Sequence, residues 1–121
     1  MHKTQPIPES PLSLEEIELI ENTGLSTSEK HYLRLIAHCL ACFKSMNKNG
    51  ANREVPIERI QLNWCLDQPI LKNDESFISL LMEQFATVGK ILEKIADEYQ
   101  ISPLDLTLKN LIKSIVSEKK N

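Results

Sequence analysis

The sequence predicts an all-α protein, a compact bundle of four main helices with a fifth, shorter one. The main observation is the stretch 76–99, whose apolar residues recur at alternating spacings of three and four, as on one face of a helix. A second observation is the presence of only three glycines and little apolar–polar alternation of the kind that strands show. A third is a pair of Ser-x-x-Glu motifs, which are typical of helix starts.

Length and composition indicate one globular domain. A chain of 121 residues that is 41% hydrophobic and 26% charged can bury a core without disulfides. Its net charge of −3 offers no electrostatic attraction to nucleic acid or to an anionic membrane. No apolar run approaches the roughly 20 residues needed to span a bilayer. Three cysteines, an odd number, favour a reducing compartment, so we expect a cytoplasmic protein.

The chain begins with a proline-rich segment and a short helix. Residues 1–11 hold three prolines, which disfavour helix, so we expect an extended N-terminal arm before a single helical domain over residues 12–121. Ser13 and Glu16 then form a capping box that starts a helix over about 13–23.

The second predicted helix runs over about 27–47. Ser26 and Glu29 form its capping box. Its apolar stripe consists of Tyr32, Ile36, Cys39, Phe43 and Met46. This stripe predicts an antiparallel partner for the central helix. A polar loop with an Asn-Gly turn at residues 49–50 follows it.

The segment 55–71 fits two structures. Pro56 at a first helical position, with apolar residues at spacings of three and four behind it, predicts a short helix near 56–66. Four residues also alternate with period two, as in a strand: Ile60, Leu62, Trp64 and Leu66. We favour the helix, because a single strand would have no partner for its hydrogen bonds.

The last two helices follow from caps and periodicity. Asn73 or Asp74 caps the central helix, which is expected over about 75–99. Ser102 is expected to cap a final helix over about 103–118, with proline in its first turn.

Small residues on the central helix suggest a place of close packing. Met82, Gly89 and Ala96 recur at spacings of seven, and glycine inside a helix costs about 1 kcal/mol relative to alanine. Either a neighbouring helix of the same chain or a second copy of the protein packs there. Because the apolar faces are broad and Leu106 falls outside the face of its own helix, we predict a homodimer whose interface includes these four residues.

A DNA-binding role is an alternative. Residues 91–115 faintly resemble a helix-turn-helix hairpin, whose second helix would present Thr107, Asn110, Lys113 and Ser114 to a major groove. The small basic surplus of this segment argues against nucleic acid as a partner.

A metal- or thiol-dependent module is a second alternative. His38 and Cys42 stand at i and i+4, Cys39 completes a Cys-x-x-Cys motif, and Cys65 could add a ligand. The chain lacks the second ligand pair of a structural zinc site, and free cysteines commonly pack in cores. We therefore expect no metal and no other cofactor.

No recognisable catalytic motif is present. The sequence contains no nucleophile with an identifiable base, no glycine-rich phosphate loop and no aspartate cluster suited to magnesium. We therefore predict a non-enzymatic helical interaction or adaptor protein that self-associates, binds an unknown protein partner and does not enter a membrane.

Overall fold

The computed structural model describes residues 13–47 and 52–120 and confirms the all-α fold. The helices are α1 (Leu14–Glu21), α2 (Thr27–Met46), α3 (Glu58–Asp67), α4 (Glu75–Tyr99), the 3-10 turn η1 (Pro103–Asp105) and α5 (Leu108–Lys120). These described residues contain no β-strand. The predicted N-terminal arm (1–11) and the turn at residues 49–50 lie outside them.

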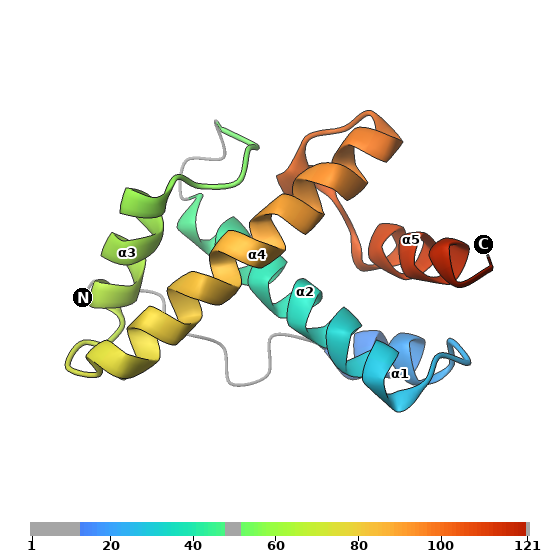
Figure 1. Cartoon of the computed structure of the whole chain (residues 1–121), viewed down its shortest axis with the longest axis horizontal. Coiled ribbons are helices and arrows are strands. Elements are labelled where there is room, and N and C mark those ends of the chain that lie inside the picture. The colour runs from blue at the N-terminus through green and yellow to red at the C-terminus, as the bar shows by residue number, and fades with distance from the viewer. Residues whose placement is uncertain (1–12, 48–51, 121) are drawn as a thin grey trace.

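The two long helices, α2 and α4, cross at the centre of the molecule, and the shorter elements surround the crossing (Figure 1). α3 packs against both long helices on one side, α5 packs against both on the other, and α1 lies along α2. The expectation of an antiparallel pair is wrong in this respect, because α2 and α4 do not run alongside each other. The short helices fill the angles that the crossing leaves open.

Aromatic rings connect three of these helices. The rings of Phe43 on α2 and Phe85 on α4 have centroids 5.2 Å apart, and Trp64 on α3 meets Phe85 edge-on at 6.4 Å. Phe85 is fully buried, and its ring contacts residues of both α2 and α3. Such tilted and edge-on pairs stabilise the fold by more than the burial of their apolar area alone.

The residues that α2 buries differ slightly from the predicted apolar stripe. Ile36, Cys39 and Phe43 are buried as expected, but Tyr32 is exposed and Leu33 takes its place in the core. A tyrosine at the edge of the apolar face keeps its hydroxyl in water, whereas leucine has no polar atom to satisfy.

Both predicted capping boxes are present. The Glu16 amide donates to the Ser13 hydroxyl at 3.2 Å and the Ser13 amide donates to the Glu16 carboxylate at 2.9 Å. Ser26 has the same exchange with its glutamate at the start of α2. Glu21 at the end of α1 forms ion pairs with Lys30 and Arg34 of α2, which tie the two helices together.

The ambiguous segment 56–66 is a helix, as we favoured, although its start differs. Ile57 is the N-cap of α3, so Pro56 lies before the helix and not in its first turn. The Pro56 carbonyl instead accepts a hydrogen bond of 2.8 Å from the Gln61 side chain. Asp74 caps α4 by accepting from the Phe77 amide at 3.0 Å.

The final helix begins later than predicted. Ser102 precedes η1, and α5 starts only at Leu108. Thr107 caps α5: its hydroxyl accepts from the Asn110 amide at 3.3 Å, and its own amide donates to the Asn110 side chain at 2.8 Å. The interruption allows Leu106 to turn into the core, which a continuous helix from residue 103 would not allow.

Two basic side chains hold η1 in place. Arg53 donates to the Leu104 carbonyl and to the Asp105 carboxylate, both at 2.8 Å, and the Leu104 amide donates to the Arg53 carbonyl at 2.9 Å. Lys44 of α2 donates to the Leu106 carbonyl at 2.9 Å. These bonds satisfy backbone groups that the short turn leaves without helical partners.

Candidate interaction surface

The predicted dimer seam lies inside the protein. Gly89, Ala96 and Leu106 are buried within the single chain, and Met82 packs partly buried against the core. A Cβ atom at Gly89 would lie 3.2 Å from Val55 Cγ1 and 4.0 Å from Phe43 Cζ, so the close neighbours belong to the same chain. Of the two interpretations of the seam, the burial of Gly89, Ala96 and Leu106 within one chain favours internal packing.

The four residues of the predicted nucleic-acid face differ in exposure: Thr107 and Lys113 are exposed, Asn110 is half-buried and Ser114 is buried. Thr107 and Asn110 bond to each other in the cap of α5, at 3.0 Å between the Thr107 hydroxyl and the Asn110 side-chain oxygen. The predicted helix from residue 103 included Thr107, whereas α5 starts at Leu108 and Thr107 is its cap.

The thiol and imidazole groups are placed for packing. Cys39, Cys42 and Cys65 are all buried and unpaired, and burial raises the pKa of Cys39 and of Cys42 to about 12. Thiols are poor nucleophiles and poor metal ligands in that state. His38 is half-buried, and desolvation lowers its pKa. Within the described residues, no group of three or more His, Cys, Asp and Glu side chains is arranged to hold a metal ion.

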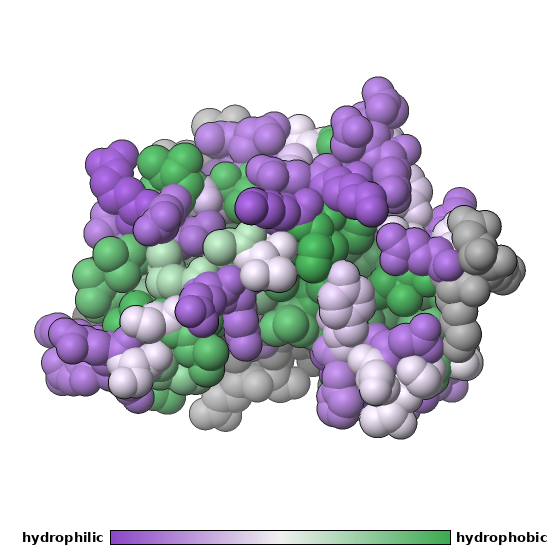
Figure 2. Space-filling model, in the orientation of Figure 1, coloured by the Kyte–Doolittle hydropathy of each residue, from purple (hydrophilic) through white to green (hydrophobic). Residues whose placement is uncertain are grey.

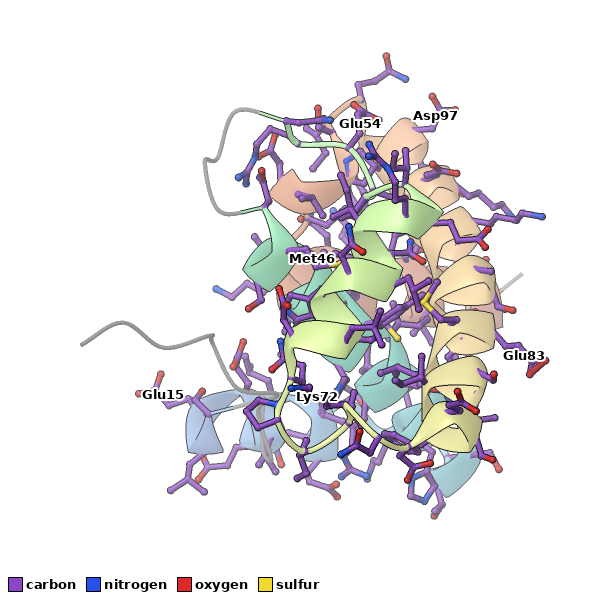
Figure 3. All side chains as sticks on the ribbon, turned by 90° about the vertical axis from the view of Figure 1, so that its left-hand side faces the viewer. Glu15, Met46, Glu54, Lys72, Glu83 and Asp97 are labelled. Carbon is purple, nitrogen blue, oxygen red and sulfur yellow. The ribbon has the colours of Figure 1, made fainter. Side chains whose placement is uncertain are left out.

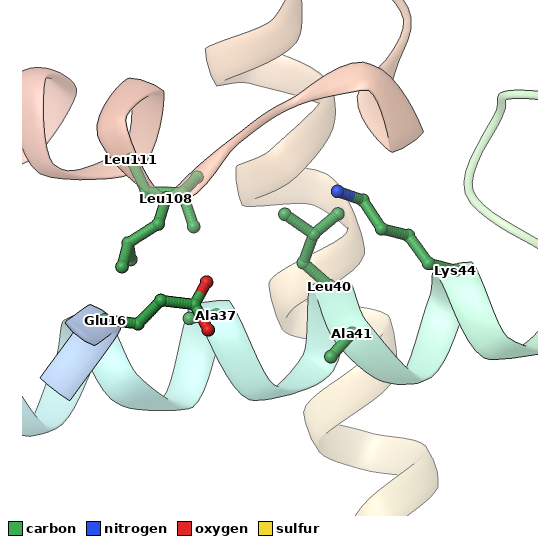
Figure 4. A pocket seen from close by; sticks show the side chains of 7 residues that line it. All are labelled: Glu16, Ala37, Leu40, Ala41, Lys44, Leu108 and Leu111. Carbon is green, nitrogen blue, oxygen red and sulfur yellow. The ribbon is translucent and has the colours of Figure 1, made fainter. Parts of the chain in front are cut away.

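A pocket of about 190 Å³ lies between α1, α2 and α5 (Figure 4). Glu16 and Lys44 stand at its two ends, and apolar side chains such as Leu40 and Leu111 form its walls. Both charged groups already have partners, because Glu16 belongs to the capping box and Lys44 bonds to the Leu106 carbonyl. The pocket therefore has no unoccupied charged group to orient a ligand.

The most unusual surface of the molecule is that of α3. Five large apolar side chains in and beside this helix are 40 to 73% exposed: Ile57, Ile60, Leu62, Leu66 and Ile70. We call these five residues the α3 surface. Two glutamines are buried on the inward side: Gln61 within α3 and Gln68, its C-cap residue. Figure 2 shows hydrophobic side chains over α3 and the adjoining half of α4.

Sequence reasoning missed this surface, although a signal for it was present. The residues Ile60, Leu62, Trp64 and Leu66 fit both a helical and a strand period, which means that apolar residues lie on more than one face of α3. In the structure α3 buries one of these faces, and the apolar residues on the other side are exposed.

Comparison with known protein families assigns nearly the whole chain to one family model. The family model described as NDH complex assembly factor CRR9 matches residues 12–121. No curated protein and no solved structure matches the chain. In the part of the chain that the structure describes, none of the helices combines the length and apolar character needed to cross a membrane.

Proposed function

The chain belongs to the family of NDH complex assembly factor CRR9, and on this basis we propose that it promotes assembly of an NDH complex by binding one of its proteins, without catalysing a reaction. The family match, which covers nearly the whole chain, carries the proposal. The exposed α3 surface supports it, because large apolar side chains that a folded domain leaves exposed on one short segment are typical of protein contact sites.

Deletion of the gene in the native cell tests the proposal. We expect the assembled NDH complex to decline on native gels, and a tagged copy of the chain to restore it and to migrate with partly assembled forms of the complex. An unchanged amount of assembled complex in the deletion strain would contradict the proposal.

Self-association and cytoplasmic location stay predictions from the sequence. Because the seam around Gly89 is internal, a dimer would have to use another surface. Sedimentation equilibrium at micromolar concentration tests the dimer, and a concentration-independent mass of 13.8 kDa would contradict it. Fluorescence microscopy of a tagged chain in its native cell tests the location.

A further inference from the structure

We propose that the α3 surface is the docking site for an amphipathic helix with an apolar face bordered by lysine and arginine. The inference rests on the proposed function, since it specifies the kind of protein segment that the assembly factor binds. The first observation in its favour is that exposed apolar residues are clustered here. Five of the twelve exposed large hydrophobic side chains in the described residues lie between Ile57 and Ile70.

α3 is held in place by groups other than these five side chains. Trp64 and Cys65 are buried on its inner face, and Trp64 contacts Phe85 of α4. Gln61 donates to the Pro56 carbonyl at 2.8 Å and Gln68 donates to the Trp64 carbonyl at 3.1 Å. Ile60, Leu62 and Leu66 therefore stand on a preformed helix, which lowers the entropy cost of binding a partner.

The outer side of α3 suits a helical partner. Leu62 and Leu66 stand one helical turn apart on one strip of the helix, and Ile70 follows at the same spacing in the turn after it. Apolar anchors at such spacing match the i, i+4 anchors with which an amphipathic helix binds a hydrophobic surface.

The charge around this surface is acidic. Residues 54–83 carry six carboxylates and two basic side chains, a net charge of −4, whereas the other 11 acidic and 12 basic residues of the chain give +1. The six acidic residues are all exposed: Glu54, Glu58, Asp67, Asp74, Glu75 and Glu83. None of them forms an ion pair within residues 13–47 and 52–120. In Figure 3, where α3 faces the viewer, Glu54 lies above it and Glu83 lies beside it on α4.

The negative charge around the α3 surface indicates which kind of partner binds there. A second copy of the chain would bring two acidic borders together, and like charges across an interface oppose binding. Nucleic acid and anionic lipid surfaces would be repelled in the same way. An apolar helix with basic borders would cover the hydrophobic side chains and bring opposite charge to carboxylates that form no ion pair within the described residues.

Calorimetric titration with two synthetic peptides tests the proposal directly. Both are amphipathic helices of about 18 residues with leucine on one face. One carries lysine on its polar face, and its twin carries glutamate. We expect the lysine peptide alone to bind the full-length protein, with an affinity that falls as salt is added. Equal affinity for both peptides, or binding to neither, would overturn the proposal.

Surface variants locate the binding. Leu62→Ser with Leu66→Ser should weaken binding of the lysine peptide about tenfold or more, because both side chains would lie at the contact. The matched control is Leu14→Ser with Leu19→Ser on α1, which removes two exposed leucines elsewhere and should leave affinity unchanged. Unchanged melting temperatures would show that both variants fold. Equal weakening in both variants would overturn the proposal, as would a dimer of the unmutated protein that the α3 substitutions disperse.

The same variants separate this inference from the proposed function. If deletion of the gene lowers the assembled NDH complex and the α3 variant restores it fully, the assembly role stands and the docking site is wrong. If deletion has no effect on the complex, the assembly role fails, while the peptide titrations still decide whether α3 binds a basic helix.

Discussion

Gln100 shows how a single residue accepts an unfavourable conformation to end a helix. Its φ of 59° and ψ of 41° lie in the left-handed region, where a side chain costs roughly 1–2 kcal/mol. Its amide donates to the Ala96 and Asp97 carbonyls, and its side chain donates to the Asp97 carbonyl at 2.8 Å. These hydrogen bonds offset part of the cost and turn the chain from α4 toward η1.

Glycine at this position should stabilise the protein. We expect Gln100→Gly to raise the free energy of unfolding by about 0.5–1 kcal/mol, because glycine adopts positive φ without a steric cost. Urea denaturation measures the change. Lys94→Gly, at an exposed position inside α4, is the control and should instead lower the free energy by about 1 kcal/mol. A loss of stability in both variants would contradict the explanation.

The buried thiols predict a loss of stability at high pH. Burial raises the pKa of Cys39 and Cys42 from 9.0 to about 12 and that of Cys65 to about 11. The unfolded chain therefore loses these protons at lower pH than the folded chain does, so the thiols favour folding below about pH 9 and lose that contribution as the pH rises toward 12.

Two measurements check this expectation. The free energy of unfolding, measured in urea, should fall between pH 9 and pH 11, and by less in a Cys39→Ala, Cys42→Ala variant. At pH 8 a thiol reagent such as Ellman's should react with the denatured protein and only slowly with the folded one. Rapid reaction of the folded protein would contradict the burial of these groups.

At the scale of the element, the start of α5 depends on tertiary contacts more than on residue type. Both Ser102 and Thr107 are suitable caps by sequence, with Asp105 and Asn110 three residues behind them. Only Thr107 makes the reciprocal bonds, because Leu106 packs into the core and the Leu104 amide is taken by Arg53. Contacts distant in sequence therefore select the cap.

Removal of that cap should destabilise the protein. We expect Thr107→Ala to lower the free energy of unfolding by about 1 kcal/mol, since the Asn110 amide loses its acceptor. Ser102→Ala serves as the comparison and should change the value by less than about 0.5 kcal/mol, because its side chain makes no capping bond. Equal losses in thermal or urea denaturation would show that both positions act as caps.

At the scale of the whole molecule, the crossing of α2 and α4 makes one continuous core. Leu92 of α4 is completely buried within it. Leu92→Ala should lower the free energy of unfolding by about 2–5 kcal/mol, because a cavity remains in a packed interior. Glu93→Ala, on the exposed side of the same helix, provides a baseline. An effect below about 0.5 kcal/mol for Leu92→Ala would mean that the core is not packed as described.

The sequence predicts helices well here because their signals are local. The capping boxes at Ser13 and Ser26 and the periodicity of 75–99 need no knowledge of tertiary structure, and each matches the observed helix closely. The crossing and the burial of Leu106 depend on residues far apart in the chain. For the same reason the candidate surface was not predicted: periodicity alone does not tell which of the two apolar sides of α3 is buried.

The bonds between Arg53 and η1 have a consequence for how the protein opens. They join residues 52 positions apart and close a loop that contains both α3 and α4. Amide hydrogens in a three-residue turn ordinarily exchange fast with solvent. The Leu104 amide should instead exchange slowly, and only when this loop opens. Arg53→Ala should speed exchange at Leu104 and in α3 together, so that α3 and η1 unfold as one cooperative unit.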